Sequence, residues 1–154
     1  MKRLFFILLI CLSGSSVYTQ DYQTAVGVRG SFISGITVKH FIQEDEALEG
    51  ILSLGNWGMN ITGLYEIHAR AFDVEGLYWY YGGGAHLGST TDEHPYFDEK
   101  GEFLVMGLDG IVGLEYNIQE IPINFSIDYK PQLNFFGDTG LTVYGGALSI
   151  RYTF

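Results

Sequence analysis

The sequence predicts an all-β protein in which one antiparallel sheet closes into an eight-stranded barrel. Three observations predict this fold class. Apolar and polar residues alternate with a period of two along most of the chain, which is the pattern of strands that separate an apolar face from a polar one. The alternating segments number eight, and most are long for a soluble sheet. After the N-terminal region, no segment keeps a helical spacing of its apolar residues.

The first residues have the order of a secretory signal peptide. Residues 1–3 are a short basic start, residues 4–12 form an unbroken apolar run, and residues 13–16 are small. The run is too short to span a bilayer as a helix, and these three regions in this order mark a segment that is removed on export. We therefore expect a signal peptide at 1–19 and a single barrel domain at 20–154.

Two cleavage points fit this segment, after Ser16 and after Thr19, and both stay open. The only cysteine, Cys11, lies inside the apolar run, so a mature chain has neither a disulfide nor a thiolate metal site. Removal of Lys2 and Arg3 changes the formal net charge from −10 to −12. Because phosphate binding needs basic patches, we expect no nucleic-acid partner for so acidic a chain.

The alternation assigns each strand in turn. It is clearest in the last three, where for example Ile127 falls on the apolar face and Asp128 on the polar one. Most of the segments reach the roughly 9–11 residues with which a tilted strand crosses a bilayer. In chain order, we expect strands at residues 24–33, 35–43, 47–55, 58–69, 76–89, 103–117, 121–133 and 141–154.

The size of the side chains predicts which face points outward. An eight-stranded barrel has an interior just wide enough for side chains or for one small ligand. One face carries bulky residues on strand after strand, such as Trp79, Tyr81 and Phe125, which is too much volume to enclose. The other face carries small residues, among them Gly84 and Gly113, with isolated charges. The bulky apolar face therefore points outward to lipid, and the sequence predicts a transmembrane barrel.

The longest connection, at about 90–102, follows the fifth strand and is expected on the outer side of the membrane. Its acidic residues offer oxygen ligands for Ca²⁺ or Mg²⁺, but their spacing is not that of an EF-hand loop. We interpret the segment as a solvated acidic loop and expect no metal or cofactor. The acidic residues are Asp92, Glu93, Asp98, Glu99 and Glu102.

With a signal peptide, eight alternating strands and the ending Arg151-Tyr152-Thr153-Phe154, the chain resembles the small OmpA/OmpX-like outer-membrane barrels. The segments 64–66 and 79–86 also resemble barrels of the Bacteroidota type. The resemblance implies export by the general secretory route, insertion among outer-membrane lipids and a monomeric state. It further implies that the barrel-assembly machinery recognises Phe154, together with Tyr152 two residues earlier.

Charged residues on the inward face form the candidate site. Buried charges have to be paired, because each costs several kcal/mol to desolvate. We expect a structural network of ion pairs that plugs the lumen, and the alternative is a gated conduit whose ion pairs rearrange. The residues are Arg29, Lys39, Glu49, Glu66, Asp109, Glu115, Asp128, Lys130 and Arg151, with Arg70 near one end.

His68 and His86 also fall on the inward face, where Glu66, Ser89 and Asp109 are their expected neighbours. A histidine, a serine and an acid are the groups of a hydrolase, but no nucleophile motif accompanies them here. We expect no catalytic residues and a non-enzymatic role in envelope structure or surface contact. Two alternatives stay open, a lipid-modifying outer-membrane enzyme and a soluble, lipocalin-like periplasmic barrel that binds a small apolar ligand.

Overall fold

The computed structural model describes residues 22–31, 34–55, 58–90, 103–136, 139–143 and 145–154, and these residues form an all-β structure. The strands are β1 (Thr24–Gly30), β2 (Ser34–Phe41), β3 (Glu46–Gly55), β4 (Gly58–Arg70), β5 (Leu77–Thr90), β6 (Phe103–Ile118), β7 (Ile123–Tyr129), β8 (Gln132–Phe136), β9 (Gly140–Thr142) and β10 (Gly146–Thr153). No helix within these ranges is long and apolar enough to cross a membrane. The predicted signal peptide and the acidic loop lie outside the described residues.

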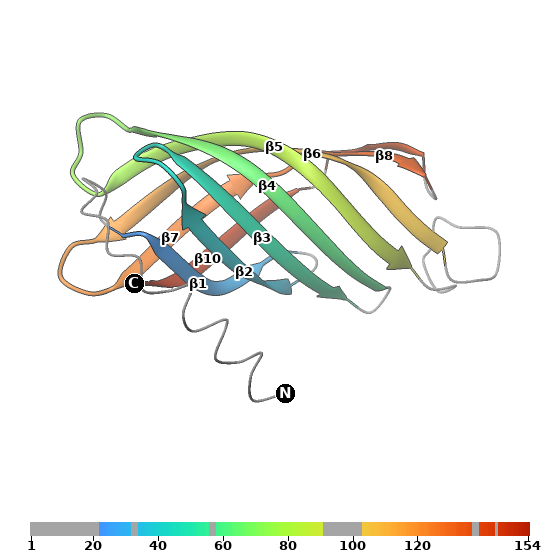
Figure 1. Cartoon of the computed structure of the whole chain (residues 1–154), viewed down its shortest axis with the longest axis horizontal. Coiled ribbons are helices and arrows are strands. Elements are labelled where there is room, and N and C mark those ends of the chain that lie inside the picture. The colour runs from blue at the N-terminus through green and yellow to red at the C-terminus, as the bar shows by residue number, and fades with distance from the viewer. Residues whose placement is uncertain (1–21, 32–33, 56–57, 91–102, 137–138, 144) are drawn as a thin grey trace.

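All strand pairs are antiparallel, and the sheet closes on itself (Figure 1). Each strand from β1 to β6 pairs with the next, β6 pairs with β7 and β8, and β10 pairs with both β7 and β1. The segments β7 and β8 follow one another along the same barrel strand, and so do β9 and β10. The ten segments therefore make eight barrel strands. The predicted closed eight-stranded barrel is confirmed.

Two of the strands predicted as continuous are interrupted. The expected strand 121–133 starts at Ile123, after Pro122, and breaks at Pro131, which has no N–H to donate to the ladder. Beside this break the Lys130 N–H donates to the Gly145 carbonyl at 2.9 Å. Gly145 therefore interrupts the expected strand 141–154 at the same level, between β9 and β10.

The register fixes how far the strands tilt. From Val26, the pairing through β2, β3, β4 and β5 leads to Leu108 on β6, whereas the pairing through β10 and β7 leads to Ile118 on the same strand. The two positions are ten residues apart (118 − 108 = 10). Such a stagger tilts the strands against the barrel axis and sets the barrel width together with the strand number. The interior is therefore narrow enough for side chains to fill.

One inward glycine makes room for the largest ring of the interior. Tyr80 is fully buried and is paired in register with Gly113. A Cβ atom on Gly113 would lie 2.6 Å from Cζ of Tyr80 and 2.7 Å from the Ile127 carbonyl oxygen. The ring therefore occupies the volume that any larger residue at position 113 would need, and the tyrosine can lie flat across the lumen.

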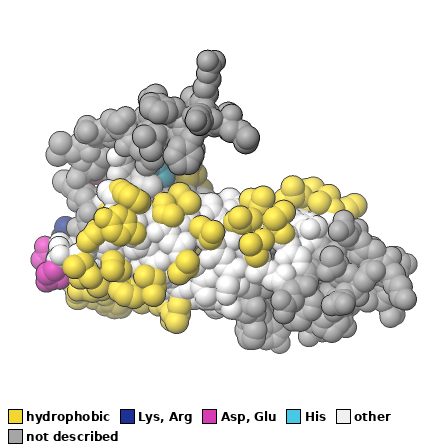
Figure 2. All heavy atoms as spheres, turned by 90° about the horizontal axis from the view of Figure 1, so that it is seen from below, with side chains coloured by type: hydrophobic (Ala, Val, Ile, Leu, Met, Phe, Trp, Pro, Cys, Tyr) yellow, Lys and Arg dark blue, Asp and Glu magenta, His cyan; other side chains and the backbone are white. Residues whose placement is uncertain are grey.

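Apolar side chains cover the described outer wall, and the exposed charges of the described residues lie at one end. The turns 42–45, 71–76 and 119–122 lie at the same end as the C-terminal Phe154, and we call this the turn end (Figure 1). In Figure 2 hydrophobic side chains are spread along the visible wall, and the visible acidic ones cluster at one end. Among the described residues, the exposed Asp, Glu, Lys and Arg residues all lie in or beside these turns, namely Glu44, Asp45, Arg70, Asp73, Glu75 and Glu120.

Exposed aromatic side chains gather near the same end, on β4 to β7, on β10 and beside them. Phe72 and Trp79 lie with their ring centroids 5.9 Å apart, and Tyr152 and Phe154 with theirs 4.9 Å apart in an edge-to-face arrangement. The exposed aromatic residues near the turn end are Tyr65, Phe72, Trp79, Tyr81, Tyr116, Phe125, Tyr152 and Phe154. The backbone of Phe154 also closes the barrel, because its N–H donates to the Thr24 carbonyl at 2.8 Å.

Candidate functional site

The nine charged residues singled out in the sequence all lie inside the barrel. Lys130 is half-buried, and the other eight are buried. They form three groups along the axis: a central cluster, a single ion pair and an outer cluster. The central cluster contains Lys39, Glu49, Glu66, Glu115 and Arg151. Because these residues come from five strands, β2, β3, β4, β6 and β10, the cluster ties together distant parts of the wall.

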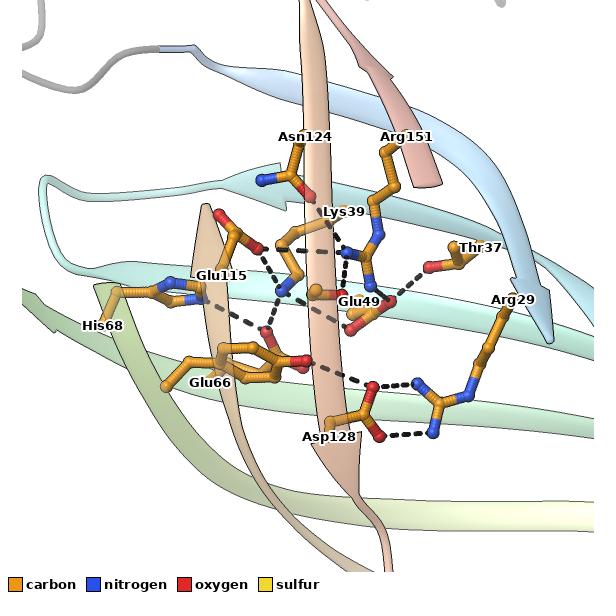
Figure 3. A network of polar contacts seen from close by, with 12 residues as sticks. Arg29, Thr37, Lys39, Glu49, Glu66, His68, Glu115, Asn124, Asp128 and Arg151 are labelled. Carbon is orange, nitrogen blue, oxygen red and sulfur yellow. Dashed lines mark hydrogen bonds and ion pairs between the residues drawn. The ribbon is translucent and has the colours of Figure 1, made fainter. Parts of the chain in front are cut away.

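Lys39 is the centre of this cluster (Figure 3). Its ammonium Nζ lies 2.8 Å from Oε2 of Glu66, 3.0 Å from Oε2 of Glu115 and 3.7 Å from Oε2 of Glu49. It also lies 4.0 Å above the ring of Tyr80, a cation–π contact. One buried cation is thus surrounded by three carboxyl groups and an aromatic face, which together compensate its desolvation.

Arg151 is the second cation of the cluster. Its Nη2 donates to Oε1 of Glu49 at 2.6 Å, and its Nη1 donates to Oγ of Ser126 at 2.7 Å and to Oδ1 of Asn124 at 3.2 Å. The hydroxyl of Thr37 donates to the same oxygen of Glu49. Planar guanidinium groups suit such divided contacts, because their donors point in several fixed directions.

Several neutral hydrogen-bond partners of the charged residues were not among the predicted site residues, and Tyr22 is the clearest of them. Its hydroxyl donates to Oε1 of Glu115 at 2.6 Å from a position before β1. Burial raises the pKa of Tyr22 well above its usual value, and the neighbouring charge of Glu115 adds to the effect. The phenol therefore keeps its proton and serves Glu115 as a donor. Tyr22 lies two residues before Thr24 and so shares its inward face, but it precedes the first strand. The alternation of apolar and polar residues within the strands therefore could not identify it.

The single ion pair joins β1 to β7. Both terminal nitrogens of Arg29 donate to the two oxygens of Asp128, each at 2.5 Å, and Tyr80 donates to the same carboxylate at 3.2 Å. The side chains are 5% and 0% exposed. This two-pronged geometry is the strongest arrangement between an arginine and a carboxylate. It connects the central cluster to the next level of the lumen through Tyr80.

The outer cluster forms around Asp109 on β6. Its carboxylate contacts Nδ1 of His86 at 2.7 Å, Nζ of Lys130 at 2.6 Å and Nε2 of Gln132 at 2.8 Å. Lys130 and Gln132 flank the break between β7 and β8. Because the strand is interrupted between them, Lys130 and Gln132 both donate to the carboxylate of Asp109.

The histidines do not assemble a catalytic group with Ser89. The ring of His68 lies against Tyr80 and its Nε2 is 3.2 Å from Oε2 of Glu66, whereas His86 belongs to the outer cluster. The expectation that Ser89 neighbours them is wrong, because Ser89 is exposed on the outer face of β5, opposite to His86. Among the described residues, no group of three His, Cys, Asp or Glu residues could hold a metal ion.

Apolar side chains fill the lumen between the polar groups. Ile51, Leu64, Tyr80 and Ile111 form one buried cluster across four strands. At the turn end, a cavity of about 320 Å³ opens above Tyr22, Phe41, His68 and Glu115. Chemically, the arrangement offers compensated ion pairs and a polar mouth. Among the described residues a hydroxyl contacts a histidine at Thr24, whose Oγ1 lies 2.8 Å from Nδ1 of His40.

These features define a class of fold, the closed eight-stranded antiparallel barrel with an apolar outer wall and a charged interior. The structure is similar to the crystal structure of the N-terminal β-barrel domain of Pseudomonas aeruginosa OprF, with a TM-score of 0.65 and 17% sequence identity over 85% of this chain and 95% of that one. At this identity the likeness is one of fold. No protein-family model matches the chain, and no curated protein matches it.

Proposed function

We propose that the protein is an integral outer-membrane β-barrel with a non-enzymatic role in envelope structure or surface contact, inserted among lipids as a monomer. The observation that carries this proposal is the distribution of charge on the outside. Among the described residues, exposed charged side chains occur only at the turn end, while the wall between the two ends carries apolar side chains. In water such a wall would aggregate, and in a bilayer it is the apolar band of a membrane barrel.

Two further observations support a membrane location. The exposed aromatic residues near the turn end, among them Trp79 and Tyr152, match the aromatic girdle that borders the lipid in outer-membrane barrels. The OprF domain, named above, has the same fold. A soluble lipocalin-like barrel is disfavoured because the interior is mainly polar and charged, which suits no small apolar ligand.

Fractionation tests the location. We expect the mature protein to stay with the membrane after washes with carbonate and with urea, and to migrate differently on a gel before and after heating. A chain that washes off and shows no heat-dependent shift would overturn the proposal.

We further propose that the three charged groups plug the lumen. Their support is that ion pairs reach across the interior from opposite walls, as Lys39 of β2 does to Glu115 of β6, and that apolar residues fill the space beside them. The expected result is negligible steady conductance of the purified protein in planar bilayers. A stable, large unitary conductance would instead favour a conduit whose ion pairs rearrange.

The serine and the histidine of the enzymatic alternative do not come together. A lipid-modifying enzyme needs its nucleophile and base on the same face, whereas Ser89 and His86 lie on opposite faces of β5. Mass spectra of lipid A from cells with and without the protein provide the check. We expect identical acyl patterns, and an altered pattern would restore the enzyme hypothesis.

A further inference from the structure

The central cluster contains one carboxyl group more than its cations can neutralise. Glu49, Glu66 and Glu115 contribute three carboxyls, and Lys39 and Arg151 contribute two cations, all at most 2% exposed. If every acid were ionised, one negative charge would be left uncompensated in a dry interior. Such a charge costs several kcal/mol, so a proton is expected to bind within the cluster.

The neighbours of the cluster supply no further charge to remove this excess. Arg29 of β1 is fully engaged by Asp128 of β7, so this pair is neutral as a unit. Tyr80 of β5 and Tyr22, before β1, are neutral phenols that act as donors. Among the described residues, the remaining hydrogen-bond partners of the cluster, from β2 and β7, are neutral side chains: Thr37, Asn124 and Ser126. Only the three acids and His68 of β4 can therefore hold the extra proton.

Unsatisfied atoms show where the proton belongs. Oε2 of Glu49 and Oε1 of Glu66 are buried and have no hydrogen-bond donor. The two glutamates lie on the paired strands β3 and β4, and both carboxyl groups contact the same ammonium Nζ of Lys39, at 3.7 and 2.8 Å. Each acid uses its other oxygen for donors: Glu49 accepts from Arg151 and Thr37, and Glu66 from Lys39. A proton on one of the two acids would let it donate to the other, since a carboxylic acid donates to a carboxylate.

The other acids and the histidine fit the proton less well. Both oxygens of Glu115 already accept from cationic or hydroxyl donors, Oε1 from Tyr22 and Oε2 from Lys39. A proton on His68 would place an N–H at Nδ1, which is buried and has no acceptor. Burying an unpaired donor of a charged ring is costlier than joining two carboxyls.

We propose that Glu49 and Glu66 form a buried proton-binding site, a carboxyl–carboxylate pair that holds one proton at neutral pH and keeps the lumen charge-balanced. The site concerns the interior alone and does not rest on the membrane location or on the conductance of the barrel. In the unfolded chain both glutamates are ionised above about pH 5. The folded state then binds one proton more than the unfolded state.

Infrared spectroscopy of the folded protein in detergent tests the proposal directly. A protonated carboxyl has a carbonyl stretch that carboxylates lack and that shifts in D₂O. We expect this band in the native protein at neutral pH, its loss in both E49Q and E66Q, and its retention in E120Q. The E120Q variant is the control, because it removes an exposed acid of the turn 119–122 and leaves the charge balance of the central cluster unchanged. Absence of the band in the native protein, or its persistence in E49Q and E66Q, would overturn the site.

The pH dependence of stability gives a second measurement. Because the folded state binds the extra proton, stability falls as the pH rises above about 5, by a factor of ten in the unfolding equilibrium constant per pH unit for one proton. Replacement of Glu66 by Gln supplies an N–H where the proton was, so E66Q should lack this one-proton contribution to the slope. Equal slopes in the native protein and E66Q would contradict the proposal.

Discussion

Replacing Asp128 with Asn is the sharpest test of whether the interior is dry. Asp128 holds Arg29 through two hydrogen bonds of 2.5 Å, and neither side chain is more than 5% exposed. In the D128N variant the shape is kept, but the guanidinium loses its counter-charge. No other described carboxylate makes an ion pair with Arg29, so the buried cation would be left uncompensated.

The expected cost follows from two independent considerations. Breaking a buried ion pair by removing one partner costs about 3–5 kcal/mol. Two hydrogen bonds to a charged group, at roughly 1.5–3 kcal/mol each, give about 3–6 kcal/mol. Both ranges correspond to a rise in the unfolding equilibrium constant of at least roughly a hundredfold, since 1.4 kcal/mol is about a factor of ten.

The double variant R29M/D128L distinguishes the loss of pairing from the loss of packing. Replacing both members of a buried pair by apolar groups of similar size is often neutral, so this variant should be more stable than D128N. The measurement is urea unfolding of the protein refolded in lipid vesicles, followed by the fluorescence of its two tryptophans and by the heat-dependent gel shift. E120Q, at the exposed turn 119–122, is the control and should change little. A cost below about 1 kcal/mol for D128N would mean that water screens the pair, and the reasoning would fail.

Three further predictions concern the wall, the glycine fit and the last residue. V112R places a charge on the middle of the outer wall and should destabilise the barrel in lipid by about 2–4 kcal/mol. Q119R at the turn end should destabilise it by less than about 1 kcal/mol. Equal costs for the two variants would argue against a bilayer around the wall. G113A should cost about 1–3 kcal/mol in the same urea assay, because its Cβ would meet Tyr80 at 2.6 Å, while G110A has its nearest contact at 3.6 Å and should be tolerated. Deletion of Phe154 should lower the yield of assembled barrel in cells far more than the stability of protein already refolded, and the reverse ranking would make the residue a structural anchor only.

The alternation predicted the barrel, because a period of two assigns each residue to a face without knowledge of its partners. It therefore placed distant residues such as Lys39 and Glu115 on the same side. Periodicity carries no information on which inward residues meet, since that depends on the stagger between strands. The pairing of Arg29 with Asp128 and the contact of Lys39 with three acids needed the register.

The misplacement of Ser89 shows a different limit. His86 and Ser89 are three residues apart, which puts them on opposite faces of any regular strand. Treating them as neighbours was wrong, and a count of residues along β5 would have revealed it. The breaks at Pro131 and Gly145 were also accessible in part, because proline cannot donate to the ladder. That the two breaks lie side by side at the same height of the barrel is shown only by the hydrogen bond between Lys130 and Gly145.

The distribution of charge connects the fold to the proposed proton site. Among the described residues inside the barrel, five acids face four basic residues, Lys and Arg. The outer cluster pairs Asp109 with Lys130, the single pair joins Asp128 to Arg29, and the central cluster has three acids for two cations. The surplus acid is thus confined to one level of the lumen. Exposed acids at the turn end are solvated and need no partner. A buried surplus acid has to be neutralised where it lies, and the free oxygens of Glu49 and Glu66 are the atoms between which a proton does so.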